Sequence, residues 1–110
     1  MKARWEVVWS QVALRDLERI VDFIAQDAEV NAAQTLDRLE GAARKLTSSP
    51  LRGRVVPELR ALALTSLREL VVPPWRLVYR VGARRVLIIG VLDSRRDLEL
   101  ALLTRLTADD

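Results

Sequence analysis

The chain has 110 residues, the size of one ordinary domain, so we expect residues 1–110 to form a single domain. Half of the residues are hydrophobic and 30% are charged, a balance that is typical of a globular protein and not of a disordered one. The sequence contains no Cys and no His, which excludes disulfides, thiolate nucleophiles, imidazole bases and Cys/His zinc sites. We expect no bound metal and no cofactor.

The charges are divided unevenly along the chain, although the formal net charge is only +3. Residues 1–49 carry 7 basic and 8 acidic side chains, whereas residues 52–85 carry 8 basic and 2 acidic ones. Most of the cations are Arg, whose planar guanidinium suits phosphates and carboxylates. The longest apolar run, residues 86–92, is too short to span a bilayer, and the N-terminus lacks the apolar region of a secretion signal. We therefore expect a cytoplasmic protein.

The first half of the chain predicts a strand followed by two helices. Apolar and polar residues alternate over residues 4–9, which is the period of a half-buried strand. Ser10 is placed to cap a helix over residues 11–26, where apolar residues recur at helical spacing. Asp27 is a candidate cap for a second helix that runs to residue 46. The short connection makes the two helices antiparallel.

The second half predicts a three-stranded meander. The pattern over residues 51–67 is weak: Gly53 and Pro57 favour a loop, and residues 58–66 fit either a short helix or irregular structure. The elements that follow are strands over 68–72, 75–81 and 86–92, joined at Pro73-Pro74 and at a hairpin loop over 82–85, and a short helix over 98–106 that Asp97 caps.

Together these elements predict an α+β fold, a small and mostly antiparallel sheet built from a strand, a helical hairpin on one face, a three-strand meander and a short C-terminal helix. The strand 86–92 is apolar on both faces, so we expect it in the middle of the sheet.

Arginines on the predicted strands form the first candidate site. Arg76 and Arg80 share one face of their strand, with Tyr79 on the opposite face. Arg68 lies nearby on the adjoining strand if the two strands form a hairpin. Partly exposed cations on a common face would bind an anion or an acidic target. The alternative is that they line a solvated face or pair with the nearby carboxylates, namely Glu58, Glu69 and Asp93.

A second candidate site follows the last predicted strand. Arg95 and Arg96 open the C-terminal helix, where the positive end of the helix dipole favours an anion or a partner carboxylate. The alternative is an ordinary helix cap in which Arg pairs with Asp97. The acidic residues of the two long helices alternate with Arg at helical spacing, which indicates a solvated surface and no pair of catalytic carboxylates.

Several segments, taken together, resemble a known family. They are Trp9-Ser10 with the helix that follows, LDRL at 36–39, GRVVPEL at 53–59, LREL at 67–70, PWRLVYRV at 74–81 and VLDSRRDL at 91–98. This order is similar to that of the ParE/RelE toxin superfamily of type II toxin–antitoxin (plasmid stabilisation) systems, over nearly the whole chain. The resemblance implies the fold described above and a toxin that a cognate antitoxin neutralises as a hetero-oligomer.

The resemblance implies two different activities. RelE-like members cleave mRNA in the ribosomal A site, and a ribonuclease of this kind would use Arg54, Arg68 and Arg76 to stabilise the phosphate and Glu58 as base. ParE-like members bind and inhibit DNA gyrase, and here Arg68, Arg76, Arg80, Arg95 and Arg96 would contact its A subunit. A third possibility is an inactive protein that only binds the antitoxin.

Proton transfer separates these activities. Cleavage of RNA needs an acid for the leaving oxygen, and this chain has no His, while the segment after the last strand offers no Tyr. Arginine cannot donate a proton near neutral pH because its pKa is too high. The sequence therefore favours the ParE-like branch, a gyrase inhibitor that acts by binding and is no enzyme.

Overall fold

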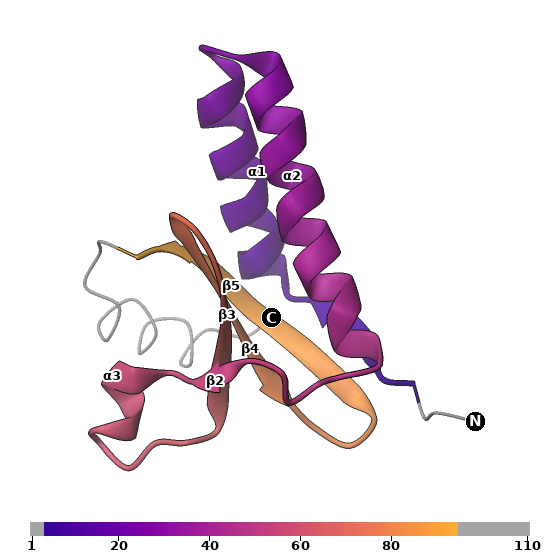
Figure 1. Ribbon diagram of the computed structural model, residues 1–110, viewed down its shortest axis with the longest axis vertical. Helices are drawn as coiled ribbons and strands as arrows, with labels where there is room; N and C mark the ends of the chain where they lie inside the picture. The colour runs from indigo at the N-terminus through magenta and orange to yellow at the C-terminus, as the bar shows by residue number, and fades with distance from the viewer. Residues whose placement is uncertain (1–3, 95–110) are drawn as a thin grey trace.

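The computed structural model describes residues 4–94, which form a five-stranded sheet with a helical hairpin on one face (Figure 1). The predicted α+β fold is confirmed. In chain order the elements are β1 (Glu6–Trp9), α1 (Gln11–Ala25), α2 (Glu29–Arg44), the 3-10 turn η1 (Lys45–Thr47), β2 (Arg54–Val55), α3 (Pro57–Arg60), β3 (Leu67–Val72), β4 (Trp75–Val81) and β5 (Arg85–Asp93). The predicted helix over 98–106 and its cap Asp97 lie outside the described residues.

The cap of α1 is the one that the sequence predicts. The Ser10 hydroxyl accepts a hydrogen bond from the Ala13 amide at 3.0 Å and donates one to the Ile89 carbonyl, so one side chain both begins the helix and fastens it to β5. The predicted cap of the second helix is wrong. Residue Ala28 occupies the N-cap of α2 and no side chain caps it. Asp27 lies one residue too early, in the turn that joins the helices.

The sheet has the strand order β1-β5-β4-β3-β2. β1 pairs with β5 in parallel, from Glu6 opposite Arg85 to Trp9 opposite Ile88, and the other pairs are antiparallel. β5 is therefore internal, as its two apolar faces predict. Within the segment that the sequence left open, a two-residue strand and a one-turn helix form around Pro57, which occupies the first turn of α3.

The alternation of side chains builds a separate apolar core on each face of the sheet. One lies between the sheet and the hairpin, and its most buried members include Leu39, Leu46, Leu77, Tyr79 and Ile88. The other lies on the opposite face beside α3 and contains Val56, Leu59, Leu67, Val78, Ile89 and Leu92.

The hairpin packs on the sheet through its base, while its tip projects beyond the sheet (Figure 1). Near the tip, Phe23 and Val30 are each 69% exposed. None of the helices within residues 4–94 is long and apolar enough to cross a membrane.

Candidate functional site

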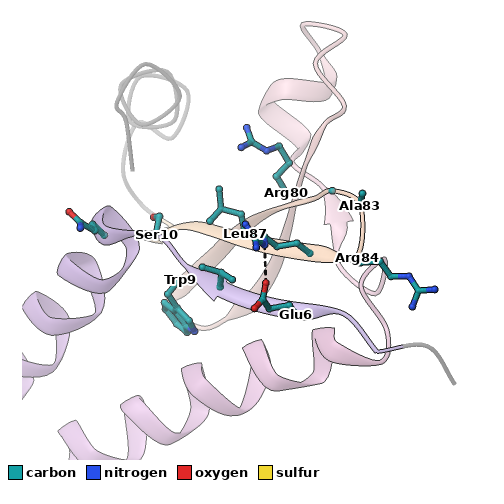
Figure 2. Close-up of a pocket in the computed structure, with 11 residues that line it drawn as sticks. Glu6, Trp9, Ser10, Arg80, Ala83, Arg84 and Leu87 are labelled. Carbon is teal, nitrogen blue, oxygen red and sulfur yellow. Dashed lines mark hydrogen bonds and ion pairs between the residues drawn. The ribbon is translucent and has the colours of Figure 1, made fainter. Parts of the chain in front are cut away.

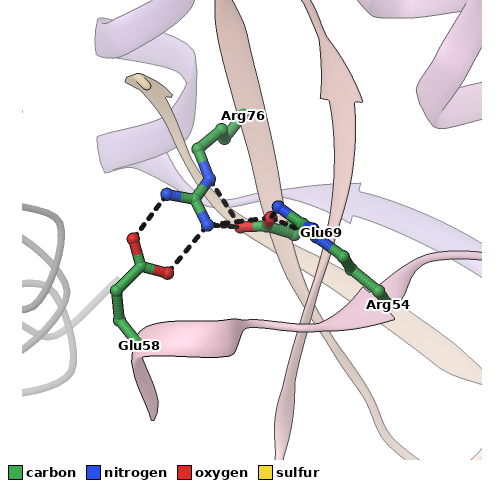
Figure 3. Close-up of polar contacts among 4 residues, drawn as sticks. All are labelled: Arg54, Glu58, Glu69 and Arg76. Atoms are coloured by element: carbon green, nitrogen blue, oxygen red, sulfur yellow. Dashed lines mark hydrogen bonds and ion pairs between the residues drawn. The ribbon is translucent and has the colours of Figure 1, made fainter. Parts of the chain in front are cut away.

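Four charged side chains, one from each of four neighbouring elements, meet on the face of the sheet that carries α3 (Figure 3). The guanidinium of Arg76 on β4 lies between two carboxylates. Nη1 and Nη2 donate to the two oxygens of Glu58 at 2.7 and 2.8 Å, and Nε and Nη2 donate to Glu69 at 2.8 and 2.9 Å. Arg54 on β2 donates to Glu69 through Nε at 2.8 Å. We call these four residues the charge cluster.

Strand register explains why these residues meet. Arg54 lies directly opposite Glu69 in the β2–β3 pair. Arg76 lies opposite Val71 in the β3–β4 pair, which makes it the diagonal neighbour of Glu69 on the same face. α3 brings Glu58 over this row from the side. The cluster therefore joins α3 to β4 directly, through Glu58 and Arg76, and to β3 through the contact of Arg76 with Glu69.

The electrostatics of the cluster follow from these contacts. Hydrogen bonds from the Arg76 guanidinium lower the pKa of Glu58 below its usual 4.5 and outweigh the opposing effect of burial. The same contact raises the pKa of Arg76 above its usual range. Glu58 is therefore held as a carboxylate. The two edges of the Arg76 guanidinium that could bind an anion already bind Glu58 and Glu69.

The expectation that Arg76 is partly exposed is wrong, because only 6% of the residue is accessible. The alternative, in which this cation pairs with Glu58 and Glu69, is the correct one. Glu69 was named only as a nearby carboxylate and not as a site residue. Its completely buried side chain is nevertheless a central member of the cluster. Its position opposite a basic residue of β2 could have been recognised only with the strand register known.

The expectation that Arg68 shares a face with Arg76 and Arg80 is wrong. Arg68 lies opposite Tyr79 in the β3–β4 pair, so its side chain is on the face of the sheet that the α1–α2 hairpin covers. There its Nη1 donates to the Gly53 carbonyl at 2.7 Å. Of the four residues expected in a ribonuclease site, the structure brings together Arg54, Glu58 and Arg76 and places Arg68 on the opposite face.

Tyr79 lies on the face opposite Arg76, as predicted, where it is buried in the core and has a polar partner. Its hydroxyl accepts a hydrogen bond from the Gly53 amide at 2.9 Å. Burial raises the pKa of Tyr79 above its usual 10.0, although the hydrogen bond from Gly53 and the charges of Arg68 and Arg52 act in the opposite direction. This phenol is therefore a poor source of protons near neutral pH.

Arg80 is exposed, as predicted, and it borders an open hollow of about 740 Å³ (Figure 2). The hollow lies where β1, the first turn of α1, the end of β4 and the β4–β5 hairpin meet. The remaining predicted contacts, Arg95 and Arg96, lie outside the described residues. Within residues 4–94, no group of side chains has the makeup of a metal site.

Comparisons with known proteins agree with this architecture. The family model described as "ParE toxin of type II toxin-antitoxin system, parDE" matches residues 7–98. Toxin RelE2 of Caulobacter vibrioides is 39% identical over 92 residues, which is 83% of this chain and 97% of that protein. Toxin ParE3 of the same bacterium is 32% identical over 88 residues, which is 79% of this chain and 84% of that protein.

Solved structures are similar in fold. A chain of the chromosomal ParDE toxin–antitoxin system from P. aeruginosa superposes with a TM-score of 0.69 at 16% identity, over 84% of this chain and 98% of that one. A chain of the RelBE2 toxin–antitoxin complex from Mycobacterium tuberculosis gives a TM-score of 0.57 at 22% identity, over 84% of this chain and 94% of that one. The family match spans most of the chain, and the protein therefore belongs to the ParE toxin family of type II toxin–antitoxin systems.

Proposed function

We propose that this toxin acts by binding the A subunit of DNA gyrase and blocking supercoiling, and that a cognate antitoxin neutralises it in a hetero-oligomer. In this proposal the protein is a binding toxin and catalyses no reaction. The alternative is ribosome-dependent cleavage of mRNA. The relatives include proteins named both ParE and RelE, so family membership alone leaves the two activities open.

The charge cluster is the observation that favours binding over cleavage. A ribonuclease of the RelE type would need Arg76 to contact a phosphate and Glu58 to remove a proton. In this chain each of these two groups is the hydrogen-bonding partner of the other. The lowered pKa of Glu58 makes it a weaker base, and the cation that would stabilise the phosphate is already neutralised by two carboxylates.

The one phenol of the chain does not compensate for this. Tyr79 is buried, has a raised pKa and lies on the opposite face of the sheet from Glu58. Binding to a protein target needs no proton transfer. It needs an exposed complementary surface, and Arg80 and Arg84 supply exposed cations on the same protein.

The proposal is tested with one toxin preparation in two assays, after the toxin has been separated from its antitoxin. We expect it to inhibit gyrase supercoiling and to leave mRNA on programmed ribosomes intact. Arg80→Glu should weaken the inhibition, whereas Arg60→Glu, an exposed change on α3, serves as the matched control. Cleavage of the mRNA in the A site that disappears in Glu58→Ala would overturn the proposal and establish the ribonuclease.

A further inference from the structure

The hollow beside Arg80 is separate from the charge cluster and has a composition of its own (Figure 2). Arg80, Arg84 and Arg85 lie around it, together with one acidic residue, Glu6. Glu6 accepts a hydrogen bond from Nε of Arg85 at 2.9 Å, so these two charges compensate each other. Arg80 and Arg84 form no ion pair within the described part of the chain. Two cations at this hollow are therefore available to a ligand.

An aliphatic surface adjoins Arg80 at the hollow. Leu87 lies opposite Val8 in the β1–β5 pair and opposite Arg80 in the β4–β5 pair, so these three side chains form one row across the sheet. In Figure 2 the side chains of Arg80 and Arg84 extend in different directions, and Leu87 lies beside Arg80. An extended ligand with two acidic groups and an apolar group fits two diverging cations and this aliphatic row.

The backbone at Arg84 is a second, independent observation. Its φ is 61°, in the left-handed region where Gly or Asn is usual and other residues are strained. Within the described residues the Arg84 side chain makes no hydrogen bond or ion pair that would offset this strain. The turn between β4 and β5 uses this left-handed residue, as tight hairpin loops do, and thereby places a cation that is unpaired within residues 4–94 at the edge of the hollow.

The lining of the hollow distinguishes a peptide from a nucleic acid. Proteins that bind single strands stack bases on exposed aromatic rings. The one aromatic residue at this hollow is Trp9, which packs against the core under the α1–α2 hairpin. Figure 2 shows its indole on the other side of β1 from Arg80. Val8 and Leu87 offer instead the aliphatic contacts that Leu or Val side chains of a peptide make.

We propose that this hollow is a docking site for an extended acidic peptide segment of a protein partner. One carboxylate of the segment pairs with Arg80 and another with Arg84, and an aliphatic side chain of the same segment packs on Val8 and Leu87. The proposal does not depend on the gyrase target, because it concerns the chemistry of the segment and is measured with a peptide alone. Failure of either proposal therefore leaves the other standing.

The test is a titration of the isotope-labelled toxin with a short capped peptide in which Glu and Leu alternate, followed by NMR. We expect the amide signals of Val8, Ala83, Arg84 and Leu87 to shift and the affinity to fall with added salt. Peptides with Lys or Ser in place of Glu and Leu, respectively, should bind more weakly. Arg80→Glu should reduce the affinity about tenfold or more, because it replaces a charge-assisted contact with a repulsion. Arg60→Glu on α3, at the opposite edge of the sheet, should leave it unchanged.

Arg84→Gly separates binding from folding. Glycine accepts the backbone conformation at this position, so the variant should melt at or above the temperature of the wild type and yet bind the peptide more weakly. Peptide binding that is equal in the wild type, Arg80→Glu and Arg84→Gly would overturn the proposal. Tighter binding of a short single-stranded oligonucleotide than of the acidic peptide would also overturn it and would assign the hollow to nucleic acid.

Discussion

The amide of Gly53 donates to the hydroxyl of Tyr79 at 2.9 Å, a contact that joins residues 26 positions apart. A polar group inside the core is thereby satisfied by the backbone of the segment that leads into β2. The approach is so close that a Cβ atom at Gly53 would lie 2.5 Å from the Glu69 carbonyl and 2.6 Å from the Tyr79 hydroxyl. The contact between Gly53 and Tyr79, two uncharged residues, therefore fixes the position of β2, the strand at the edge of the sheet that carries Arg54 of the charge cluster.

Gly53→Ala is expected to destabilise the protein by about 1 to 3 kcal/mol, because the added methyl group meets backbone and a buried ring. Gly41→Ala is the matched control. Its Cβ would meet only the end of the Arg44 side chain, at 3.7 Å, and alanine favours the helix by about 1 kcal/mol. Urea denaturation should show opposite signs for the two variants. Equal stability of Gly53→Ala and the wild type would mean that the loop moves freely away from Tyr79.

Arg76→Met is expected to cost about 3 to 5 kcal/mol, because it leaves the buried carboxylate of Glu69 with Arg54 alone. Arg54→Met should cost less, since the Arg54 side chain is 58% exposed. The double variant Arg76→Met/Glu69→Met should be more stable than the sum of the two single changes predicts. Unfolding by urea measures the wild type, the three single variants and the double variant. Additive losses would show that the two side chains do not interact energetically.

Glu58 should make the stability depend on pH in the acidic range. Its pKa is lowered on folding, so its contribution is present above its usual 4.5 and is lost as the pH falls through the lower value of the folded protein. Glu58→Gln should be less stable than the wild type by about 1 kcal/mol at neutral pH. Denaturation across a series of pH values should show this difference shrinking below 4.5. A difference that stays constant with pH would argue against the ion pair.

Tyr79 is the only tyrosine of the chain, so tyrosinate absorbance reports this one side chain. Because its pKa is raised on folding, the folded protein holds the phenol proton more tightly than the unfolded chain does. The stability from this group is complete below the usual 10.0 and is lost as the pH rises above it. We expect the absorbance to rise only above 10.0 and together with loss of near-UV circular dichroism. Ionisation at the usual pKa in a still folded protein would contradict the buried contact.

Most of the fold could be predicted because its signals are local. The Ser10 cap depends on a neighbour three residues away, and the helical and strand periods are visible within one element. Asp27 failed as a cap because the sequence does not determine which residue of a tight turn takes the extended conformation. The segment around α3 could not be assigned because its helix is a single turn, held in place by contacts with the sheet.

The candidate site was harder to predict because it depends on strand register. A shift of one residue moves a side chain to the other face, and this explains why Arg68 was grouped with Arg76 although it lies beside Tyr79. The burial of Arg76 and the role of Glu69 depend on pairings between three strands and a short helix. None of these pairings has a local signature.

The parallel pairing of β1 with β5 links the order of synthesis to the completion of the sheet. β1 is made first, and its partner in the sheet is made some 79 residues later, the separation of Glu6 and Arg85. α1 likewise waits for β5, since Asp16 accepts a hydrogen bond from the Val91 amide and Ser10 bonds to Ile89. A nascent chain that has not yet extended past β5 therefore lacks the wall of the hollow and the anchor of the hairpin. The surface of the hollow and the packing of the α1–α2 hairpin on the sheet are therefore completed only after β5 has been added to the chain.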